Sequence, residues 1–162
     1  MDRGSVYYAH PDGSAIREVV HPIETPNGIG LSPDGRTLYV AETLGARVWA
    51  WDIEAPGELG GREHAFGPGR LIYSFTGYGR LDSLAIDSEG NIVVATLGTG
   101  CITALRPDGR VRAVVPVPEF DLMVTNVCFG GDALRTAYIT SSGLGRLYAT
   151  KWHCPGAPLN FA

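Results

Sequence analysis

The sequence predicts an all-β protein built from β-propeller blades, and three observations lead to this fold class. The 162 residues include 22 glycines and 11 prolines without any low-complexity run, which is typical of many short strands joined by tight turns. One pattern of strand, turn and strand recurs along the chain, and no segment shows the apolar period of about 3.6 residues that predicts an amphipathic helix. A propeller is favoured over a sandwich because each repeat takes in about four strands over roughly forty to fifty residues.

The first hairpin of the repeat is found at three places. Its segments are PNGIGLSPDGRTLYVAET from Pro26, LDSLAIDSEGNIVVAT from Leu81 and TNVCFGGDALRTAYIT from Thr125. Each segment opens near a short amide or carboxylate side chain and continues with an apolar strand, a polar turn and a second strand. We align Asn27, Asp82 and Asn126 as the residues that open the three units.

A second hairpin is expected after each first one. The segments are ARVWAWDIEAPGEL, GCITALRPDGRVRAVV and GRLYATKWHCPGAPL, with Pro-Asp-Gly or Ala-Pro-Gly turns. In the first of them Val48 and Ala50 alternate with Trp49 and Trp51, as expected for a strand whose two faces both pack. We therefore expect the three tryptophans, the third being Trp152, to pack between blades.

These repeats predict one partial propeller domain over residues 1–162. Residues 1–20 match the second half of a blade, and three blades are expected at 26–78, 81–118 and 124–162. Three and a half blades do not close a ring, which needs about four to eight, and open blades leave strand edges and apolar faces uncovered. The sequence is therefore expected to be the C-terminal part of a longer propeller, or to pair with a second copy that completes the ring.

Composition excludes several classes of function. The net charge is −4 with scattered basic residues, so no nucleic-acid surface is expected. No apolar run reaches the roughly eighteen residues of a membrane helix, and the N-terminus lacks the features of a signal peptide. The cysteines, Cys101, Cys128 and Cys154, are odd in number and form no Cys-x-x-Cys pair, which favours free thiols in a cytoplasmic protein. The four histidines are spread singly along predicted loops, where surface or packing roles are expected.

The candidate site lies where the innermost strands of the blades begin. Asn27, Asp82 and Asn126 are expected to ring one mouth of the central channel, where their oxygens suit Ca²⁺ or Mg²⁺ and also zinc or manganese with an open position. The alternative is that each side chain only caps its local turn. Glu42, at the end of TLYVAET, either lines the channel and touches a substrate, or forms a salt bridge or contacts solvent at the end of its strand.

The same segments, PNGIGLSPDGRTLYVAET, LDSLAIDSEGNIVVAT and TNVCFGG in this order, resemble the C-terminal half of the SMP-30/gluconolactonase/LRE family. The resemblance implies a six-bladed β-propeller with one divalent metal in its channel, Ca²⁺ before Zn²⁺, Mg²⁺ or Mn²⁺. Asn27 matches the asparagine metal ligand of the family, and Asp82 matches the aspartate that binds the metal and acts as general acid and base. Ser83 stands where the family usually has glycine, and the glutamate ligand of the family has no counterpart in this sequence.

The leading hypothesis from the sequence is therefore a metal-dependent hydrolase that opens sugar lactones, with a small-molecule lactone as substrate. Two alternatives remain open. One is a non-enzymatic or inactive propeller fragment that acts as a binding module. The other is a propeller esterase that keeps the fold and the metal but acts on a different ester or lactone.

Overall fold

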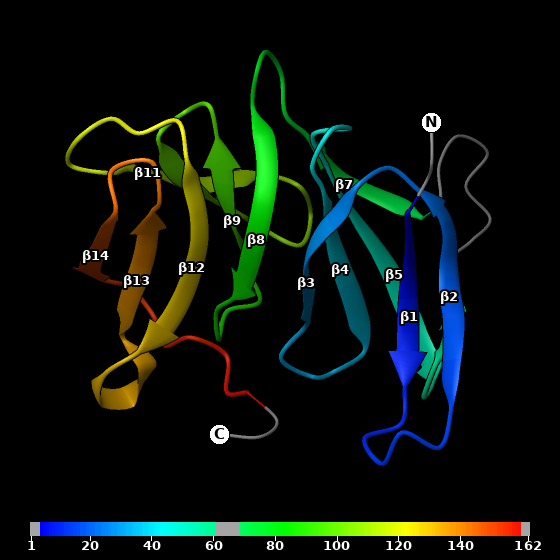
Figure 1. Ribbon diagram of the computed structural model, residues 1–162. Helices are drawn as coiled ribbons and strands as arrows, with labels where there is room; N and C mark the ends of the chain where they lie inside the picture. The colour runs from blue at the N-terminus through cyan, green and yellow to red at the C-terminus, as the bar shows by residue number, and fades with distance from the viewer. Residues whose placement is uncertain (1–3, 61–68, 160–162) are drawn as a thin grey trace.

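The computed structural model describes residues 4–60 and 69–159, and nearly all regular structure in them is β-strand (Figure 1). A two-stranded sheet comes first, followed by a five-stranded, a four-stranded and a three-stranded sheet. Their strands are β1 (Gly4–Ala9), β2 (Ile16–Ile23); β3 (Pro26–Leu31), β4 (Thr37–Glu42), β5 (Arg47–Ala55), β6 (Glu58–Gly60), β7 (Arg70–Ser74); β8 (Arg80–Ile86), β9 (Ile92–Leu97), β10 (Cys101–Leu105), β11 (Val111–Pro116); β12 (Val124–Gly130), β13 (Thr136–Ser141) and β14 (Arg146–Lys151). The short 3₁₀ helix η1 (Asp132–Leu134) joins β12 to β13.

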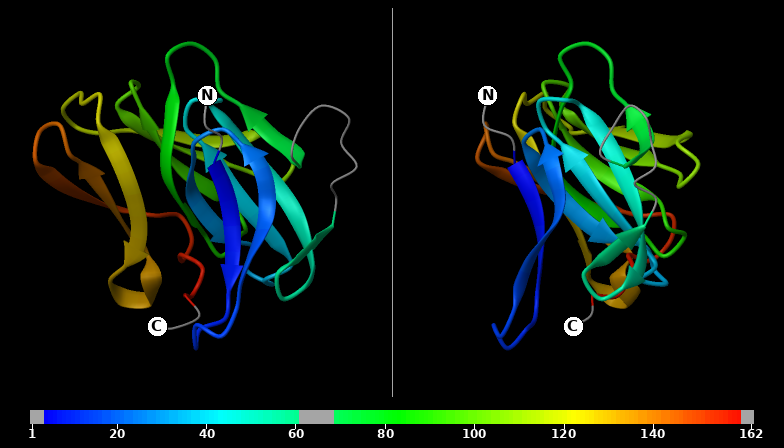
Figure 2. Two further views of the ribbon diagram at one scale, coloured as in Figure 1. Left: turned by 45° about the vertical axis from the view of Figure 1, so that its right-hand side comes forward. Right: turned by 90° about the vertical axis from the view of Figure 1, so that its right-hand side faces the viewer.

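The sheets stand side by side as propeller blades. All strand pairs are antiparallel and mostly follow chain order, with β3, β8 and β12 each at one edge of its sheet. These three strands contact one another, β3 against β8 and β8 against β12, and the other strands of each sheet lie farther from this contact (Figures 1 and 2). The predicted fold class, an all-β partial propeller, is confirmed.

Apolar side chains fill the spaces between neighbouring sheets in three clusters. Strand β9 shows how: Ile92 and Val94 pack toward the β3–β7 sheet, whereas Val93 and Ala95 pack toward the β12–β14 sheet. Alternate residues of a strand point to opposite faces. A strand that packs against a neighbouring blade on both faces therefore has apolar residues at successive positions of its sequence. Trp49 and Trp51 lie in the cluster between the first two sheets, and Trp152 lies in the cluster between the last two, as the sequence predicts.

The outer position of the second blade is shared by two short strands. β6 pairs with the C-terminal half of β5, and β7 pairs with its N-terminal half. Residues 61–68, which connect β6 to β7, lie outside the described part of the chain, as do the two ends of the predicted 1–162 domain. The first sheet has only the single hairpin that the sequence predicts for its N-terminal segment.

The last blade differs from the prediction of a second hairpin in GRLYATKWHCPGAPL. Of the two strands expected there, the described residues form only β14. After Lys151 the chain crosses to the turn between β8 and β9, where Asp87 forms a β-bridge with Gly156. The physical reason lies in Pro155 and Pro158, because proline has no N–H to donate to a sheet ladder.

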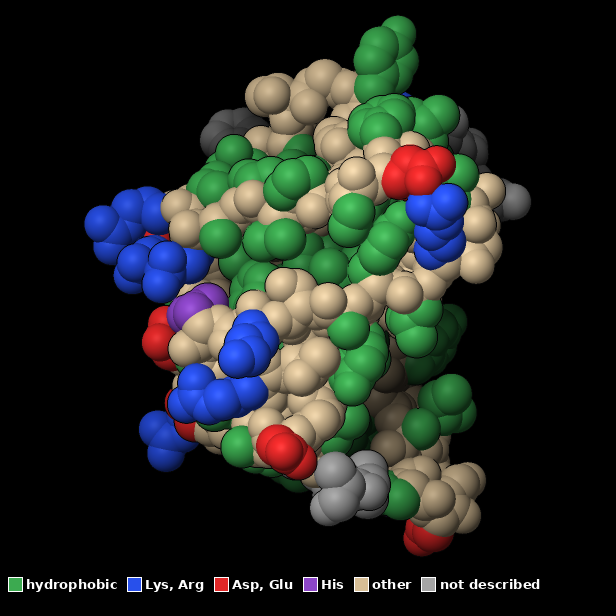
Figure 3. All heavy atoms as spheres, turned by 90° about the vertical axis from the view of Figure 1, so that its left-hand side faces the viewer, with side chains coloured by type: hydrophobic (Ala, Val, Ile, Leu, Met, Phe, Trp, Pro, Cys, Tyr) green, Lys and Arg blue, Asp and Glu red, His purple; other side chains and the backbone are tan. Residues whose placement is uncertain are grey.

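No strand in the described part of the chain packs over the far side of this last blade. Strand register places Asn126, Thr140 and Leu147 in one row across that sheet, and Leu147 is 66% exposed. Figure 3 views the molecule from this side and shows hydrophobic side chains on the surface together with several basic side chains. Within the described residues, no helix is long and apolar enough to cross a membrane.

Candidate functional site

The innermost strands share a β-bulge close to their first residues. In β3 the bulge contains Asn27 and Gly28, and in β8 it contains Asp82 and Ser83. In β12 the register shifts at Thr125. A bulge places two residues opposite one, bends the strand and re-aims side chains, and bulges are over-represented next to active sites. Two of the sequence-predicted site residues therefore lie at corresponding positions in neighbouring blades.

The register corrects the alignment of Asn126. The pairs Pro26–Glu42, Leu81–Thr96 and Val124–Ser141 mark the same level in three blades. Counted from these pairs, the counterpart of Asn27 and Asp82 is Thr125, and Asn126 corresponds to Gly28 and Ser83. The sequence alignment of Asn126 is wrong by one residue, because it pairs residues by their amide or carboxylate side chains and not by the apolar residue that follows the bulge. The Asn126 side chain is bonded locally, since its Oδ1 accepts a hydrogen bond from the Val127 N–H at 2.8 Å.

Gly28 brings β3 and β8 into unusually close approach. A Cβ atom at Gly28 would lie 2.6 Å from the Leu84 nitrogen and 2.7 Å from the Asp82 carbonyl oxygen. These are backbone atoms, which cannot swing aside as the end of a flexible side chain would. A residue with any side chain would force the two strands apart, so glycine is required for this close contact between β3 and β8.

The side chains of Asn27 and Asp82 are not engaged by the protein. Asn27 is exposed and Asp82 is half-buried. Among residues 4–60 and 69–159, neither side chain takes part in a hydrogen bond or ion pair, and the half-buried Ser83 hydroxyl makes none to Asp82. A carboxylate without donors is costly to bury unless a cation or another donor meets it. The Asp82 oxygens are therefore available to a metal ion, to water or to a substrate.

Glu42 has a different environment. Its side chain is buried, and Oε1 accepts a hydrogen bond from the Glu24 N–H at 2.8 Å. Oε2 accepts one from Trp49 Nε1 at 3.1 Å and pairs with Arg47 Nη1 at 3.4 Å. The structure thus gives Glu42 the strand-end salt bridge, and its carboxylate is enclosed rather than open to a substrate. The expectation that it lines the channel is corrected.

Asp121, which is not among the site residues predicted from the sequence, holds the loops near the start of β12 together by hydrogen bonds. Its carboxylate accepts hydrogen bonds from Ser141 Oγ at 2.5 Å, from the Met123 N–H at 2.8 Å and from the Leu144 N–H at 3.2 Å. These donors, the Ser141 hydroxyl first, hold the pKa of Asp121 below its usual range. The bond to a backbone N–H two residues on is the usual pattern of an Asx turn, which is the one signal that the sequence offered.

A cleft of about 650 Å³ runs along the inner strands beyond the bulges. Its walls come from the later residues of β3, β8 and β12 and from the C-terminal segment, including Ile29, Leu84, Asn126, Phe129 and Leu159. Asn126 therefore lines a cavity, whereas Asn27 and Asp82 lie outside its lining, nearer to the other end of the strands.

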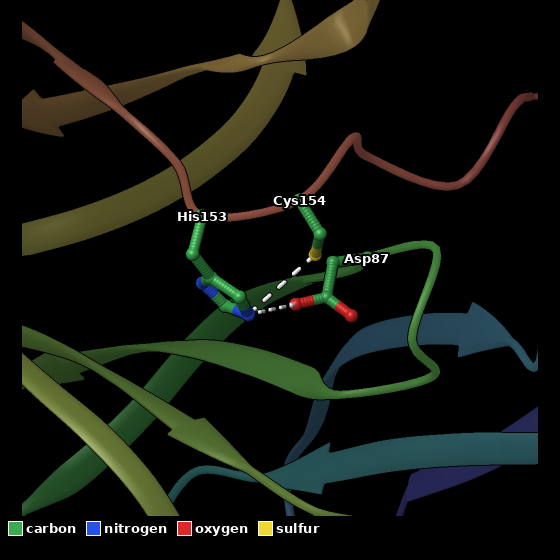
Figure 4. A group of neighbouring side chains, drawn as sticks. All are labelled: Asp87, His153 and Cys154. Carbon is green, nitrogen blue, oxygen red and sulfur yellow. Dashed lines mark hydrogen bonds and ion pairs between the residues drawn. The ribbon is translucent and has the colours of Figure 1, made fainter.

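A second group of side chains meets where the C-terminal segment reaches the β8–β9 turn (Figure 4). The ring of His153, the thiol of Cys154 and the carboxylate of Asp87 converge, and their ligand atoms all lie within 4.8 Å of one another. Burial raises the pKa of the Cys154 thiol, and the neighbouring Asp87 carboxylate raises it further. The sequence reasoning did not foresee this cluster, because Asp87 belongs to a different repeat from the other two residues.

Comparison with known proteins places these features in a family context. The sequence profile described as "SMP-30/Gluconolactonase/LRE-like region" matches residues 1–143. Lactonase drp35 of Staphylococcus saprophyticus subsp. saprophyticus is 34% identical over 119 residues, which are 74% of this chain and 36% of that protein.

Solved structures agree with this match. A gluconolactonase from Xanthomonas campestris has a TM-score of 0.68 at 28% identity, over 87% of this chain and 42% of its own. The calcium-binding protein regucalcin from Agrobacterium tumefaciens str. C58 has the same fold, with a TM-score of 0.76 at 22% identity, over 98% of this chain and 55% of its own. The chain spans about a third of the curated relative and about half of these two structures.

Proposed function

This chain belongs to the SMP-30/gluconolactonase/LRE-like family, and we propose that its activity is the metal-dependent hydrolysis of sugar lactones at Asn27 and Asp82. The observation that carries the proposal is the Asp82 carboxylate. It is half-buried, it has no partner among the described residues, and its backbone contacts Gly28, which follows Asn27 in the neighbouring blade. The names of the similar proteins, a lactonase and a gluconolactonase, support lactones as the class of substrate.

The residues fit a hard divalent cation. A carboxylate and an amide supply only oxygen atoms, which suits Ca²⁺ first, and Mg²⁺, Mn²⁺ or an open Zn²⁺ site after it. Calcium takes about six to eight oxygen ligands, so Asn27 and Asp82 would fill a minority of its positions. Water, the substrate and further protein ligands would fill the others, and binding by these two residues alone is expected to be weak.

The chain's own residues then account for the proton transfers. A bound divalent cation would polarise the lactone carbonyl as a Lewis acid. Asp82 accepts a proton from the water molecule that attacks the carbonyl carbon. As the bond from that carbon to the ring oxygen breaks, Asp82 returns the proton to the ring oxygen, so that lactone and water give the open hydroxy acid. Asn27, on the neighbouring inner strand, would supply its amide oxygen to the cation as a second ligand.

Closing the channel requires more blade surface than the described residues provide. The first sheet has two strands, and the face of the last sheet is uncovered. Further blades, or a second copy of this chain, would have to cover these surfaces to complete a ring around the site. The proposed activity therefore belongs to the closed assembly.

Substitution of Asp82 tests the proposal. We expect Asp82→Ala and Asp82→Asn in the assembled protein to lower the metal-stimulated turnover of sugar lactones by about 10²-fold or more, as for the loss of a general acid and base. Asp52→Asn is the matched control, because it removes one negative charge from an exposed position on β5, away from the inner strands. The measurement is kcat over a panel of lactones and esters.

The panel also separates the competing hypotheses. Turnover of esters in preference to lactones would indicate the esterase alternative. Wild-type protein that binds the cation without hydrolysing any member of the panel would indicate a binding module. Full lactonase activity in both Asp82 variants would remove Asp82 from the reaction and contradict the mechanism.

A further inference from the structure

We propose a second metal site in this chain, formed by Asp87, His153 and Cys154 and suited to a borderline cation such as Zn²⁺. It is separate from the channel. Asp87 follows the last residue of β8, whereas Asp82 lies near the first, and five residues of strand span roughly 16 Å. The site joins the β8–β9 turn of one blade to the segment after β14 of the next.

Two of the three spacings between ligand atoms are close to those of a tetrahedral centre, and the third lies within 4.8 Å. His153 Nε2 lies 3.5 Å from Cys154 Sγ and 3.8 Å from Asp87 Oδ2. With zinc bonds of about 2.0–2.1 Å to nitrogen and about 2.3 Å to sulfur, tetrahedral angles separate ligand atoms by about 3.3–3.6 Å. The observed spacings need only small side-chain adjustments around a central ion. Glu89 is a candidate for the fourth position, since its Oε2 lies 3.4 Å from the same His153 nitrogen.

A single nitrogen has three polar neighbours in this cluster. The Asp87 carboxylate, the Glu89 carboxylate and the Cys154 thiol all approach His153 Nε2, which can form a full hydrogen bond with only one of them. A cation placed between them would meet all of them at once. Imidazole, thiolate and carboxylate together favour Zn²⁺ or Co²⁺ over Ca²⁺, whereas Asn27 and Asp82 offer only oxygen.

The surrounding contacts hold the ligands in place. Asp87 is fully buried, and its carboxylate accepts hydrogen bonds from Asn91 Nδ2 and from Trp152 Nε1, the latter at 3.0 Å. The Ser88 N–H donates to the Pro155 carbonyl at 2.9 Å, which fixes the backbone on the other side of the cluster. Outer contacts of this kind orient metal ligands and raise affinity. The side chain of His153 is 30% exposed, which leaves a route for the ion.

The same geometry does not suit a thiol nucleophile. A catalytic cysteine–histidine–carboxylate arrangement uses both ring nitrogens, one toward the thiol and one toward the carboxylate. Here His153 presents Nε2 to both. Binding of a divalent metal does not need proton transfer through the histidine ring, because the Cys154 thiol gives up its proton to solvent as the sulfur–metal bond forms.

Titration of the complete chain with Co²⁺, after removal of metals with a chelator and in the presence of a phosphine reductant, tests the site. We expect one equivalent of Co²⁺ to produce a thiolate-to-cobalt charge-transfer band and tetrahedral visible bands, and Zn²⁺ to abolish them. Cys154→Ser should lose the charge-transfer band. Cys128→Ser is the matched control, because that cysteine is exposed on β12, and it should keep the band.

Two further variants keep the test decisive. His153→Gln changes a partly exposed residue and should weaken Co²⁺ binding at least tenfold, with the far-UV circular dichroism unchanged. Asp82→Asn should leave the cobalt spectrum unchanged whatever it does to lactone hydrolysis, so that the two proposals fail independently. A wild-type chain without a charge-transfer band at saturating Co²⁺, or a band that survives in Cys154→Ser, would overturn the second site.

Discussion

Three aspartates show how one functional group serves different purposes at the residue scale. Asp121 accepts three hydrogen bonds, which stabilise its ionised form and lower its pKa. Asp87 is enclosed and bonded to Asn91 and Trp152. Asp82 has no such donors among the described residues. A carboxylate that accepts hydrogen bonds is held in its ionised form, whereas one without donors can take up and release a proton, and for this reason we assign the proton transfers to Asp82.

The close approach at Gly28 leads to a prediction at this scale. Gly28→Ala places a methyl group against the backbone of Asp82 and Leu84, and such overpacking costs about 1–3 kcal/mol of unfolding free energy. Because β3 and β8 must separate, we also expect lactonase activity to fall. Urea unfolding and kcat on the same preparation measure the two effects.

Gly79→Ala is the control for this substitution. A Cβ at Gly79 would meet its nearest neighbours, Phe75 Cβ and the Thr76 carbonyl oxygen, at 3.7 Å, which is an ordinary contact distance. Stability and activity should stay close to wild type. If Gly28→Ala behaved in the same way as Gly79→Ala, the tight contact between β3 and β8 would not be what positions Asn27 and Asp82.

At the residue scale, the sequence predicted the positions of several key side chains, but not the features that depend on strand register or on contacts in space. Matching of the repeats located Asn27 and Asp82 at corresponding positions, and strand alternation predicted that Trp49 and Trp51 pack between blades. The same matching misplaced Asn126 by one residue, because it followed the amide side chain, whereas strand register makes Asn126 the counterpart of Gly28 and Ser83. The environment of Glu42 depends on the Trp49 and Glu24 groups that surround it in space, which the local pattern could not reveal.

At the scale of elements, the segment after β14 ties the last two blades together. The Ala157 N–H donates to the Ile86 carbonyl, and the Gly156 N–H donates to the Leu134 carbonyl, at 2.9 and 2.8 Å. Trp152 adds its ring to the apolar cluster between these blades and its N–H to the Asp87 carboxylate. The segment thus bridges neighbouring blades where a further strand pair was expected.

Trp152→Phe tests this bridging contact. Phenylalanine keeps an aromatic ring but leaves the Asp87 carboxylate without the indole N–H, and a hydrogen bond to a charged group contributes about 1.5–3 kcal/mol. We expect a loss of stability of that order, measured by urea unfolding with a chelator present. Amide hydrogen exchange of Ser88 and Ala157, which bond across the junction, should become faster.

Trp49→Phe provides the comparison. It removes an indole N–H from the buried Glu42 carboxylate in a different blade, so it should destabilise the protein without a selective effect on the Ser88 and Ala157 amides. Unchanged exchange of these two amides in Trp152→Phe would show that the side chain does not secure the junction.

Turn motifs and the alternation of apolar residues are local signals, so the strands could be predicted from the sequence, whereas the path of residues 152–159 could not. Pro-Asp-Gly and Asp-Ser-Glu-Gly turns between apolar runs are local signals, and they predicted the hairpins of β3–β4, β8–β9 and β10–β11. The path of residues 152–159 is set by bonds to groups about 65–70 positions earlier, such as Asp87 and Ile86. The prolines in the segment argued against a strand, but they did not indicate where it would dock.

At the scale of the whole molecule, the innermost strands β3, β8 and β12 lie side by side, and Asn27 and Asp82 occupy corresponding positions in two neighbouring blades. Apolar clusters between successive sheets hold the blades in order. The arrangement leaves the two-stranded first sheet and the face of β12–β14 open. An oxygen-lined site at the inner strands and a mixed nitrogen, sulfur and oxygen site at the blade junction would then select different metals in the same chain.

The most direct test of the central claim is the position of Mn²⁺, located by its anomalous scattering in crystals of the assembled protein grown with that ion. We expect a peak between the Asn27 amide oxygen and the Asp82 carboxylate, and loss of this peak in Asp82→Asn. Manganese bound elsewhere, with no peak at this pair of side chains, would contradict the assignment of Asn27 and Asp82 as the metal ligands.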